Sequence, residues 1–138
     1  MNKKMNLYSD GGARGNPGPA AIAFIATNEA GITLKADSCF IGYHTNNQAE
    51  YQALIMGLEY AAANQVQEVT CYLDSELVTK QVTGLYRIKN TELKRLNKQV
   101  KDLLNCFKQV NILNVPREHP QITRADSLVN KKLDEQTK

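Results

Sequence analysis

The first forty residues alternate between short apolar runs and turn-forming residues, which is the pattern of adjacent β-strands. Runs at 6–10, 20–27 and 32–41 predict three strands. The segment between the first two is rich in glycine and proline, and residues 28–31 have the composition of a hairpin turn. Because the links are short, we expect these strands to form an antiparallel meander.

The pattern changes to helical spacing after residue 44. Thr45 and Gln48 have the spacing of a capping box, and the residues that follow carry two apolar stripes, which predicts a largely buried helix. An apolar run at 68–73 predicts a fourth strand, and Ser75 is placed to cap a short helix that runs to about residue 82. Residues 84–90 read as a loop, 93–107 as an amphipathic helix, 109–115 as a fifth strand, 118–123 as a loop and 125–135 as a last helix.

The resulting element order is βββαβααβα. The meander favours antiparallel pairing, whereas the strand–helix–strand units favour parallel pairing, so we expect an α/β fold with a mixed five-stranded sheet and helices on both faces. We find no linker, repeat or low-complexity tract and predict a single domain over residues 1–138. Ligands in such sheets bind beyond the carboxyl ends of the strands.

Composition narrows the class of protein only slightly. The formal charge of +3 is too small to argue for a polyanionic partner without help from the distribution of charge. The three cysteines form no C-x-x-C pair, and Cys71 and Cys106 fall in apolar runs, so we expect buried, reduced thiols. No apolar leader precedes the first strand and no stretch is long enough to span a bilayer. These features predict a cytoplasmic protein with no membrane association.

Four acidic residues lie at the edges of predicted elements. Asp10 ends the first strand before two glycines, Glu50 lies in the first turns of the first helix, Asp74 ends the fourth strand and Asp126 opens the last helix. Taken singly, each reads more readily as a turn former or a helix cap. If the fold brings them together, the four carboxylates cannot all stay ionised without cations, and hard divalent ions prefer such oxygen ligands. The joint pattern therefore indicates metal-assisted phosphoryl chemistry and Mg²⁺.

The segments around these acids carry a family resemblance. Asp10-Gly11-Gly12 with Gly15-Asn16-Pro17-Gly18-Pro19, then Thr45-Asn46-Asn47-Gln48-Ala49-Glu50, Leu73-Asp74-Ser75 and Ala125-Asp126-Ser127-Leu128 together resemble type 1 ribonuclease H, over nearly the entire chain. The resemblance implies the strand order 3-2-1-4-5 with strand 2 antiparallel. It also implies endonucleolytic hydrolysis of the RNA strand of RNA–DNA hybrids, which gives 5′-phosphate and 3′-hydroxyl ends. Asp10, Glu50, Asp74 and Asp126 would then hold two Mg²⁺ ions, with Mn²⁺ as the alternative, and Asp10 would touch both.

The same resemblance implies a set of substrate contacts. The 2′-hydroxyl groups that distinguish RNA from DNA are read in the minor groove, where small and amide groups suit the task. The residues implied there are Gly11, Asn16, Asn46, Gln48 and Ser75, and Thr45 with Asn16 would hold a phosphate of the DNA strand. A plain turn at Asn16 and a capping box at Thr45 and Gln48 are the structural alternatives.

The chain also departs from the family pattern. Glu76 stands where many members have glutamine. His119 is the one candidate for a histidine that many members carry before the last acid. Its spacing to Asp126 does not clearly match theirs, and the structural alternative is a surface residue. The basic, tryptophan-rich protrusion of well-known bacterial members is missing. The basic residues nearby, represented by Arg87, Lys89 and Lys94, form either a track for phosphates or the solvated face of a helix.

Two other functions remain open from the sequence. One is a noncatalytic nucleic-acid-binding module on the same fold, against which the retained set of four acids argues. The other is a different enzyme, either a relaxed nuclease that also accepts double-stranded RNA or another member of the wider polynucleotidyl-transferase superfamily. A monomer is the default expectation for the oligomeric state.

Overall fold

The computed structural model describes residues 3–136, which form five strands and four helices in the predicted order. The strands are β1 (Lys4–Ala13), β2 (Gly18–Thr27), β3 (Thr33–His44), β4 (Glu68–Leu73) and β5 (Gln109–Asn114). The helices are α1 (Asn46–Ala63), α2 (Glu76–Val82), α3 (Thr91–Leu104) and α4 (Pro120–Gln136).

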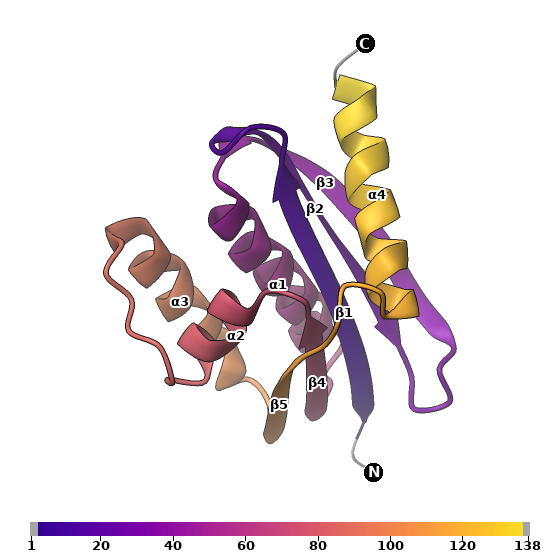
Figure 1. The fold of residues 1–138 in the computed structure, drawn as a ribbon. Coiled ribbons are helices and arrows are strands. Elements are labelled where there is room, and N and C mark those ends of the chain that lie inside the picture. The colour runs from indigo at the N-terminus through magenta and orange to yellow at the C-terminus, as the bar shows by residue number, and fades with distance from the viewer. Residues whose placement is uncertain (1–2, 137–138) are drawn as a thin grey trace.

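The five strands form one sheet in the order β3-β2-β1-β4-β5, as the sequence predicted (Figure 1). Strand β2 is antiparallel to both β1 and β3, whereas β4 is parallel to β1 and β5 is parallel to β4. The carboxyl ends of β1 and β4 therefore meet at the same edge of the sheet, which is where the sequence placed Asp10 and Asp74.

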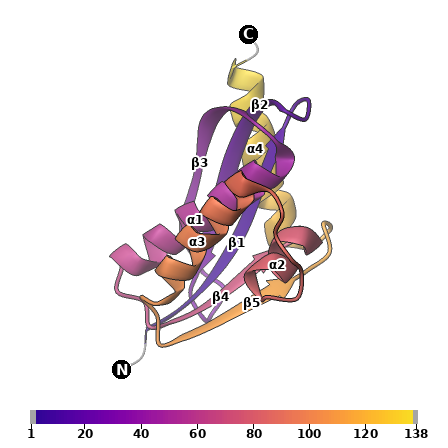
Figure 2. The ribbon, with the colours of Figure 1, turned by 90° about the vertical axis from the view of Figure 1, so that its left-hand side faces the viewer.

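Helices cover both faces of the sheet, which confirms the predicted layers. Helices α1 and α3 lie side by side on one face, and α4 packs on the other face over β1, β2 and β3 (Figure 2). Strand β2 is sandwiched between the two layers: Phe24 and Ala26 face α1, while Ala23 and Ile25 face α4. Burial on both faces explains why this strand is a continuous apolar run with no alternation.

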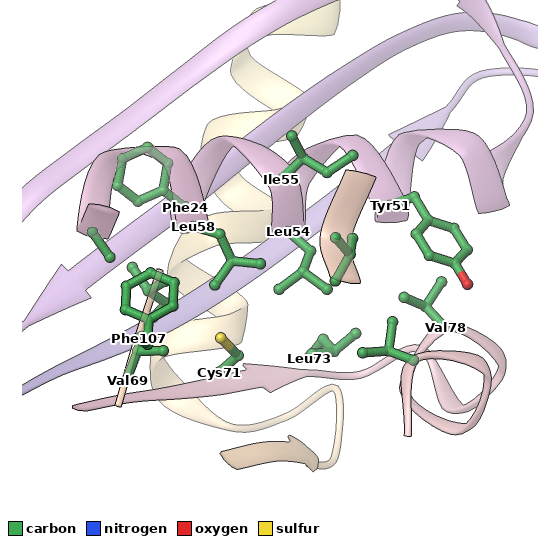
Figure 3. Packing of buried hydrophobic residues seen from close by; sticks show 14 of the residues in the cluster. Phe24, Tyr51, Leu54, Ile55, Leu58, Val69, Cys71, Leu73, Val78 and Phe107 are labelled. Carbon is green, nitrogen blue, oxygen red and sulfur yellow. The ribbon is translucent and has the colours of Figure 1, made fainter. Parts of the chain in front are cut away.

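The largest core cluster lies between α1, α3 and the sheet. Figure 3 shows Leu54 and Leu58 of α1 above Val69, Cys71 and Leu73 of β4. This packing anchors the buried face of α1 and leaves its first turn at the sheet edge that carries Asp10. The position of α1 is therefore set by the core rather than by the site.

Several predicted boundaries were wrong, and two of them lie beside the acids. Strand β1 does not end at Asp10 but continues through both glycines to Ala13, because it stays paired with β2 as far as Ala13–Ala20. Helix α4 begins at Pro120 rather than at residue 125, so Asp126 lies inside the helix and does not open it. Proline is well suited to the first helical position because its missing N–H would have no intrahelical partner there.

The predictions for the capping box and the cysteines were confirmed in part. The capping box is confirmed, since the Gln48 amide donates to the Thr45 hydroxyl and the Thr45 amide donates to Gln48 Oε1. Cys71 is buried as expected, but Cys106 is exposed, which corrects the expectation for that thiol. Across residues 3–136, no helix combines the length and the apolar character needed to cross a membrane.

Candidate active site

Strand β1 has an open edge next to Asp10. Its parallel pairing with β4 ends at Tyr8–Tyr72, whereas its antiparallel pairing with β2 continues through Asp10–Ala23. Asp10 is the seventh of the ten residues in β1 and keeps only 7% of its surface exposed. Beyond Tyr8, therefore, the backbone of β1 needs hydrogen-bond partners from elsewhere.

Helix α1 supplies these partners with two side chains. The Gly11 amide donates to Glu50 Oε1 at 2.6 Å, and the Ala13 amide donates to Asn46 Oδ1 at 2.8 Å. Residues four apart on a helix are separated by about 6 Å along its axis, and residues two apart on a strand by about 6.6 Å. One face of α1 can therefore satisfy two successive free amides, and in doing so it brings the Glu50 carboxylate to Asp10.

This approach of helix to strand requires a glycine at position 11. A Cβ atom on Gly11 would lie 2.9 Å from the Glu50 nitrogen and still closer to the Ala49 carbonyl group. Both neighbours are backbone atoms and cannot turn away. The missing side chain at Gly11 thus has a packing reason, and its substrate role stays a prediction.

Asp74 is fixed on both sides. The carbonyl oxygen of Leu73, which ends β4, accepts from Asn114 Nδ2 and from the Val115 amide at 3.0 Å each. On the other side, Ser75 caps α2, and its hydroxyl accepts from the Val78 amide at 3.2 Å. Asp74 therefore sits on a short, well-held segment between a strand end and a helix cap.

Asp126 reaches the site from the opposite face of the sheet. Ala125 and Val129 of α4 are buried against β2, which turns Asp126 toward the open edge of β1. Asn130, one helical turn later, donates from Nδ2 to Asp126 Oδ2 at 3.2 Å. Three layers of the fold, the sheet and the helices on each face, thus contribute to one place.

The four acids line a single cavity of about 380 Å³. Oxygens of Asp10, Glu50 and Asp74 all lie within 4.8 Å of one another, whereas Asp126 lines the same cavity outside that closest group. The structure therefore brings together the four carboxylates that the sequence selected, with three in close proximity and the fourth on the cavity wall.

Burial and mutual repulsion perturb these carboxylates. Burial, followed by the charges of Asp74 and Asp126, raises the pKa of Asp10 from 3.8 to about 7. Burial also raises the pKa of Glu50 well above its usual value, although the hydrogen bond from Gly11 opposes the shift. The pKa of Asp74 is raised by burial and held down in part by the Arg117 guanidinium. Such shifts show that the charged cluster is unfavourable by itself.

A divalent cation fits this donor set. Hard cations such as Mg²⁺ bind carboxylate oxygens and require several of them close together, as Asp10, Glu50 and Asp74 provide. A bound cation would also favour the ionised forms that burial disfavours. The arrangement has the chemistry of a metal centre for phosphoryl transfer.

Comparison with known proteins agrees with this geometry. A family model described as "Reverse transcriptase-like" matches residues 8–132. A ribonuclease HI of Halobacterium salinarum is 39% identical over 132 residues, which cover 96% of this chain and 65% of the relative. The chain belongs to the ribonuclease H family. The predicted fold and family are both confirmed.

Two further proteins are similar to nearly the whole of this chain. The structure of LC11-RNase H1 in complex with an RNA/DNA hybrid has a TM-score of 0.90 at 38% identity and covers 97% of this chain and 99% of that one. A bifunctional protein of Mycobacterium tuberculosis is 38% identical over 95% of this chain. The chain spans 36% of that protein's length and 65% of the Halobacterium relative's length.

His119 lies beside the cavity of this ribonuclease H domain rather than among the residues that line it. Its ring stacks on Tyr8, with centroids 5.3 Å apart, and meets Tyr72 edge-on. Its Nδ1 accepts from the Gln121 amide and its carbonyl oxygen accepts from the Thr123 amide. These contacts give His119 a structural reason, as the residue that precedes α4 and holds its first turn.

Sequence reasoning missed three polar residues that line the cavity, namely Arg14, Arg117 and Asn130. Arg14 donates to Asp134 at 2.6 Å, which ties the loop after β1 to α4. Arg117 comes from the loop before α4. Only Asn130 had a signal in the sequence, since it lies four residues after Asp126 and so on the same helical face.

Most of the predicted substrate residues lie around the first turn of α1, and two of the set, Gly11 and Asn46, line the cavity. Asn16 Oδ1 accepts from the Asn46 amide at 3.0 Å, so the loop after β1 caps the helix together with Thr45. Gln48 is held in the capping box, and Ser75 caps α2. The capping alternatives are therefore real features of the structure, and the substrate role of these residues stays a prediction.

The predicted basic residues lie away from the cavity, on the loop before α3 and on α3 itself. Arg87, Lys89 and Lys94 are exposed, and within residues 3–136 none of them forms an ion pair. Glu76 differs, because it pairs with Lys80 at 2.7 Å and accepts from the Tyr86 hydroxyl at 3.3 Å. The acid that replaces the usual glutamine is thus turned along α2 and is partly neutralised.

Proposed function

We propose that this chain is a metal-dependent endoribonuclease that cleaves the RNA strand of RNA–DNA hybrids. The observation that carries the proposal is the group of three carboxylates, with oxygens within 4.8 Å of one another, at the sheet edge of a ribonuclease H fold. A structural neighbour with 38% identity is described in complex with an RNA/DNA hybrid, which supports the substrate class.

Asp10, Glu50, Asp74 and Asp126 would hold two Mg²⁺ ions, with Mn²⁺ as the alternative. Bound there, the ions would lower the pKa of the attacking water and neutralise the charge that develops on the leaving 3′ oxygen. Asp10 interacts with each of the other three carboxylates and would contact both ions. Cleavage of the bond between the phosphorus and that 3′ oxygen would leave a 5′-phosphate and a 3′-hydroxyl group.

The chain's own groups prepare the site for this reaction. The Gly11 amide holds one oxygen of Glu50, and Asn130 holds one oxygen of Asp126, so each carboxylate is oriented before a cation binds. Arg117 lines the cavity beside Asp74, so it brings a positive charge to the place where a phosphate would enter. Fixed donors of this kind need no reorganisation during the reaction.

The hybrid would lie across the first turn of α1. Gly11, Asn16, Asn46, Gln48 and Ser75 would meet the minor groove, where the 2′-hydroxyl groups mark RNA. Thr45 and Asn16 lie at the amino end of α1, which favours a phosphate of the DNA strand. The exposed, unpaired charges of Arg87, Lys89 and Lys94 would attract the backbone further along.

A cleavage assay with three labelled substrates tests the function. Wild-type protein should cut hybrid in Mg²⁺, leave duplex DNA intact and lose activity in EDTA. Asp10→Asn should bind hybrid without cutting it, whereas Asp37→Asn, which changes an exposed carboxylate on β3, should cut normally. Cutting of double-stranded RNA would widen the substrate class. Binding of hybrid by wild type without any Mg²⁺-dependent cutting would establish a noncatalytic module instead.

A monomeric state and a cytoplasmic location stay predictions from the sequence.

A further inference from the structure

Three helices are joined by a chain of hydrogen bonds close to the acidic cluster. The Tyr51 hydroxyl of α1 donates to Gln81 Oε1 of α2 at 2.8 Å. Asn97 Nδ2 of α3 donates to the Tyr51 oxygen at 3.2 Å. Because Asn97 already donates to that oxygen, the hydroxyl proton is directed at Gln81.

This chain of hydrogen bonds lies in an apolar environment. Tyr51 is fully buried and Gln81 is 6% exposed. Their neighbours include Val78 and Val82 of α2, and Figure 3 shows Tyr51 directly above Val78 at one end of the core cluster. Apolar side chains of the same volume would fill this space without desolvating a hydroxyl and an amide. What the polar pair adds is direction, since a hydrogen bond fixes the distance and angle between two helices.

The bonded residues are next to two of the cluster's carboxylates in the sequence. Glu50 directly precedes Tyr51 on α1. Helix α2, which carries Gln81, begins immediately after Asp74 and its capping residue Ser75. The Tyr51–Gln81 hydrogen bond therefore joins the helix that carries Glu50 to the helix that follows Asp74.

Helix α2 depends on such a tertiary bond for its position. It has seven residues, too few to be a stable helix by itself, and it buries Val78, Thr79, Gln81 and Val82. Movement of α2 against α1 would move Ser75 and so would change the distance from Asp74 to Glu50.

We propose that Tyr51, Gln81 and Asn97 are positioning residues that set the separation of Glu50 and Asp74 for cation binding. The inference rests on the proposed metal-dependent function. The three side chains would not touch the cation or the substrate. They would act by holding α1, α2 and α3 at one spacing.

Binding of Mn²⁺ to the protein alone tests the inference without any cleavage step. Free Mn²⁺ is followed by electron paramagnetic resonance during a titration of wild type, Tyr51→Phe and Tyr60→Phe. Tyr60 is the matched control because it lies on the same helix and packs on Phe24 at the far end of the core. Loss of the directed hydrogen bond should weaken Mn²⁺ binding by Tyr51→Phe roughly 3- to 10-fold. Tyr60→Phe should bind as wild type does.

A double variant separates positioning from packing. Tyr51→Phe alone leaves the Gln81 amide buried without its donor, which also lowers thermal stability. Tyr51→Phe with Gln81→Leu removes both polar partners, so the melting temperature should return close to that of wild type while Mn²⁺ binding stays weak. Recovery of both properties in the double variant, or unchanged binding by Tyr51→Phe, would overturn the inference.

The wild-type titration distinguishes the two proposals. If wild type binds no Mn²⁺ that is lost in Asp10→Asn, the metal-dependent function itself fails. If wild type binds Mn²⁺ at that site and Tyr51→Phe binds it equally well, only the positioning role fails.

Discussion

Replacement of Gly11 by alanine should damage the site far more than the same replacement at Gly12. The new Cβ would lie 2.9 Å from the Glu50 nitrogen and closer still to the Ala49 carbonyl group. Nonbonded carbon atoms rest at about 3.5–4.0 Å, so α1 must move away from β1 by about 1 Å. The 2.6 Å bond from the Gly11 amide to Glu50 lies in the path of that movement.

Two magnitudes follow from this displacement. Overpacking of this kind costs about 1–3 kcal/mol of unfolding free energy. A shift of about 1 Å in the Glu50 carboxylate should reduce kcat on the order of 100-fold. The loss of activity should persist at temperatures where the variant is fully folded, because the cause is the position of a carboxylate and not the population of folded protein.

Urea denaturation and single-turnover cleavage of hybrid measure the two effects. Gly12→Ala is the matched control for stability, since its Cβ would meet nothing nearer than Val129 Cγ1 at 3.9 Å. Its unfolding free energy should stay within about 1 kcal/mol of wild type. If Gly11→Ala and Gly12→Ala proved equally stable, or if Gly11→Ala cleaved hybrid at the wild-type rate, the close approach of α1 to β1 would not be what places Glu50.

Three more outcomes are expected. The raised pKa means that the folded protein binds the proton of Asp10 more tightly than the unfolded chain does. Without divalent ions, the free energy of unfolding should therefore fall as pH rises from about 4 to 7. In EDTA at pH 8, Asp10→Asn should be more stable than wild type by at least about 1.4 kcal/mol, the equivalent of one pKa unit. His119→Ala should lose about 1 kcal/mol of stability, as caps do, and cleave at close to the wild-type rate. Charge reversal at Arg87, Lys89 and Lys94 should weaken hybrid binding through the loss of two to three phosphate contacts. The slope of the logarithm of the binding constant against the logarithm of the salt concentration should become shallower by roughly 0.7–0.9 for each lost contact.

Each of these outcomes has a contrary result and a control. Thermal unfolding that is independent of pH in EDTA would show that neither burial nor the neighbouring charges perturb Asp10 in the metal-free protein. A loss of cleavage by His119→Ala at unchanged melting temperature would return this residue to the mechanism. Charge reversal at Lys35, which is exposed on β3, should leave hybrid binding unchanged. If it weakened binding as much per charge as the reversals at Arg87, Lys89 and Lys94 do, only the net charge of the protein would matter.

The long elements were readable from the sequence because their periodicity reports burial directly. The continuous apolar run in β2 and the two stripes on α1 reflect contact on more than one face, and both were confirmed. The ends of elements were harder to predict. Two glycines after Asp10 look like a turn, yet they remain in β1 because β2 pairs with them. The residues before Asp126 look like a loop, although Ile122 continues the buried stripe of α4.

The sequence by itself selected the four candidate carboxylates, because carboxylates in these four settings are few and the local motifs are distinctive. It could not determine how those residues meet. Only the tertiary structure decided that Asp10, Glu50 and Asp74 form the closest group, that Arg117 stands beside them and that His119 packs on Tyr8 instead. The physical reason is the open edge of β1. Where β4 stops pairing, free amides need partners, and the side chains of α1 that supply them carry a carboxylate into the cavity.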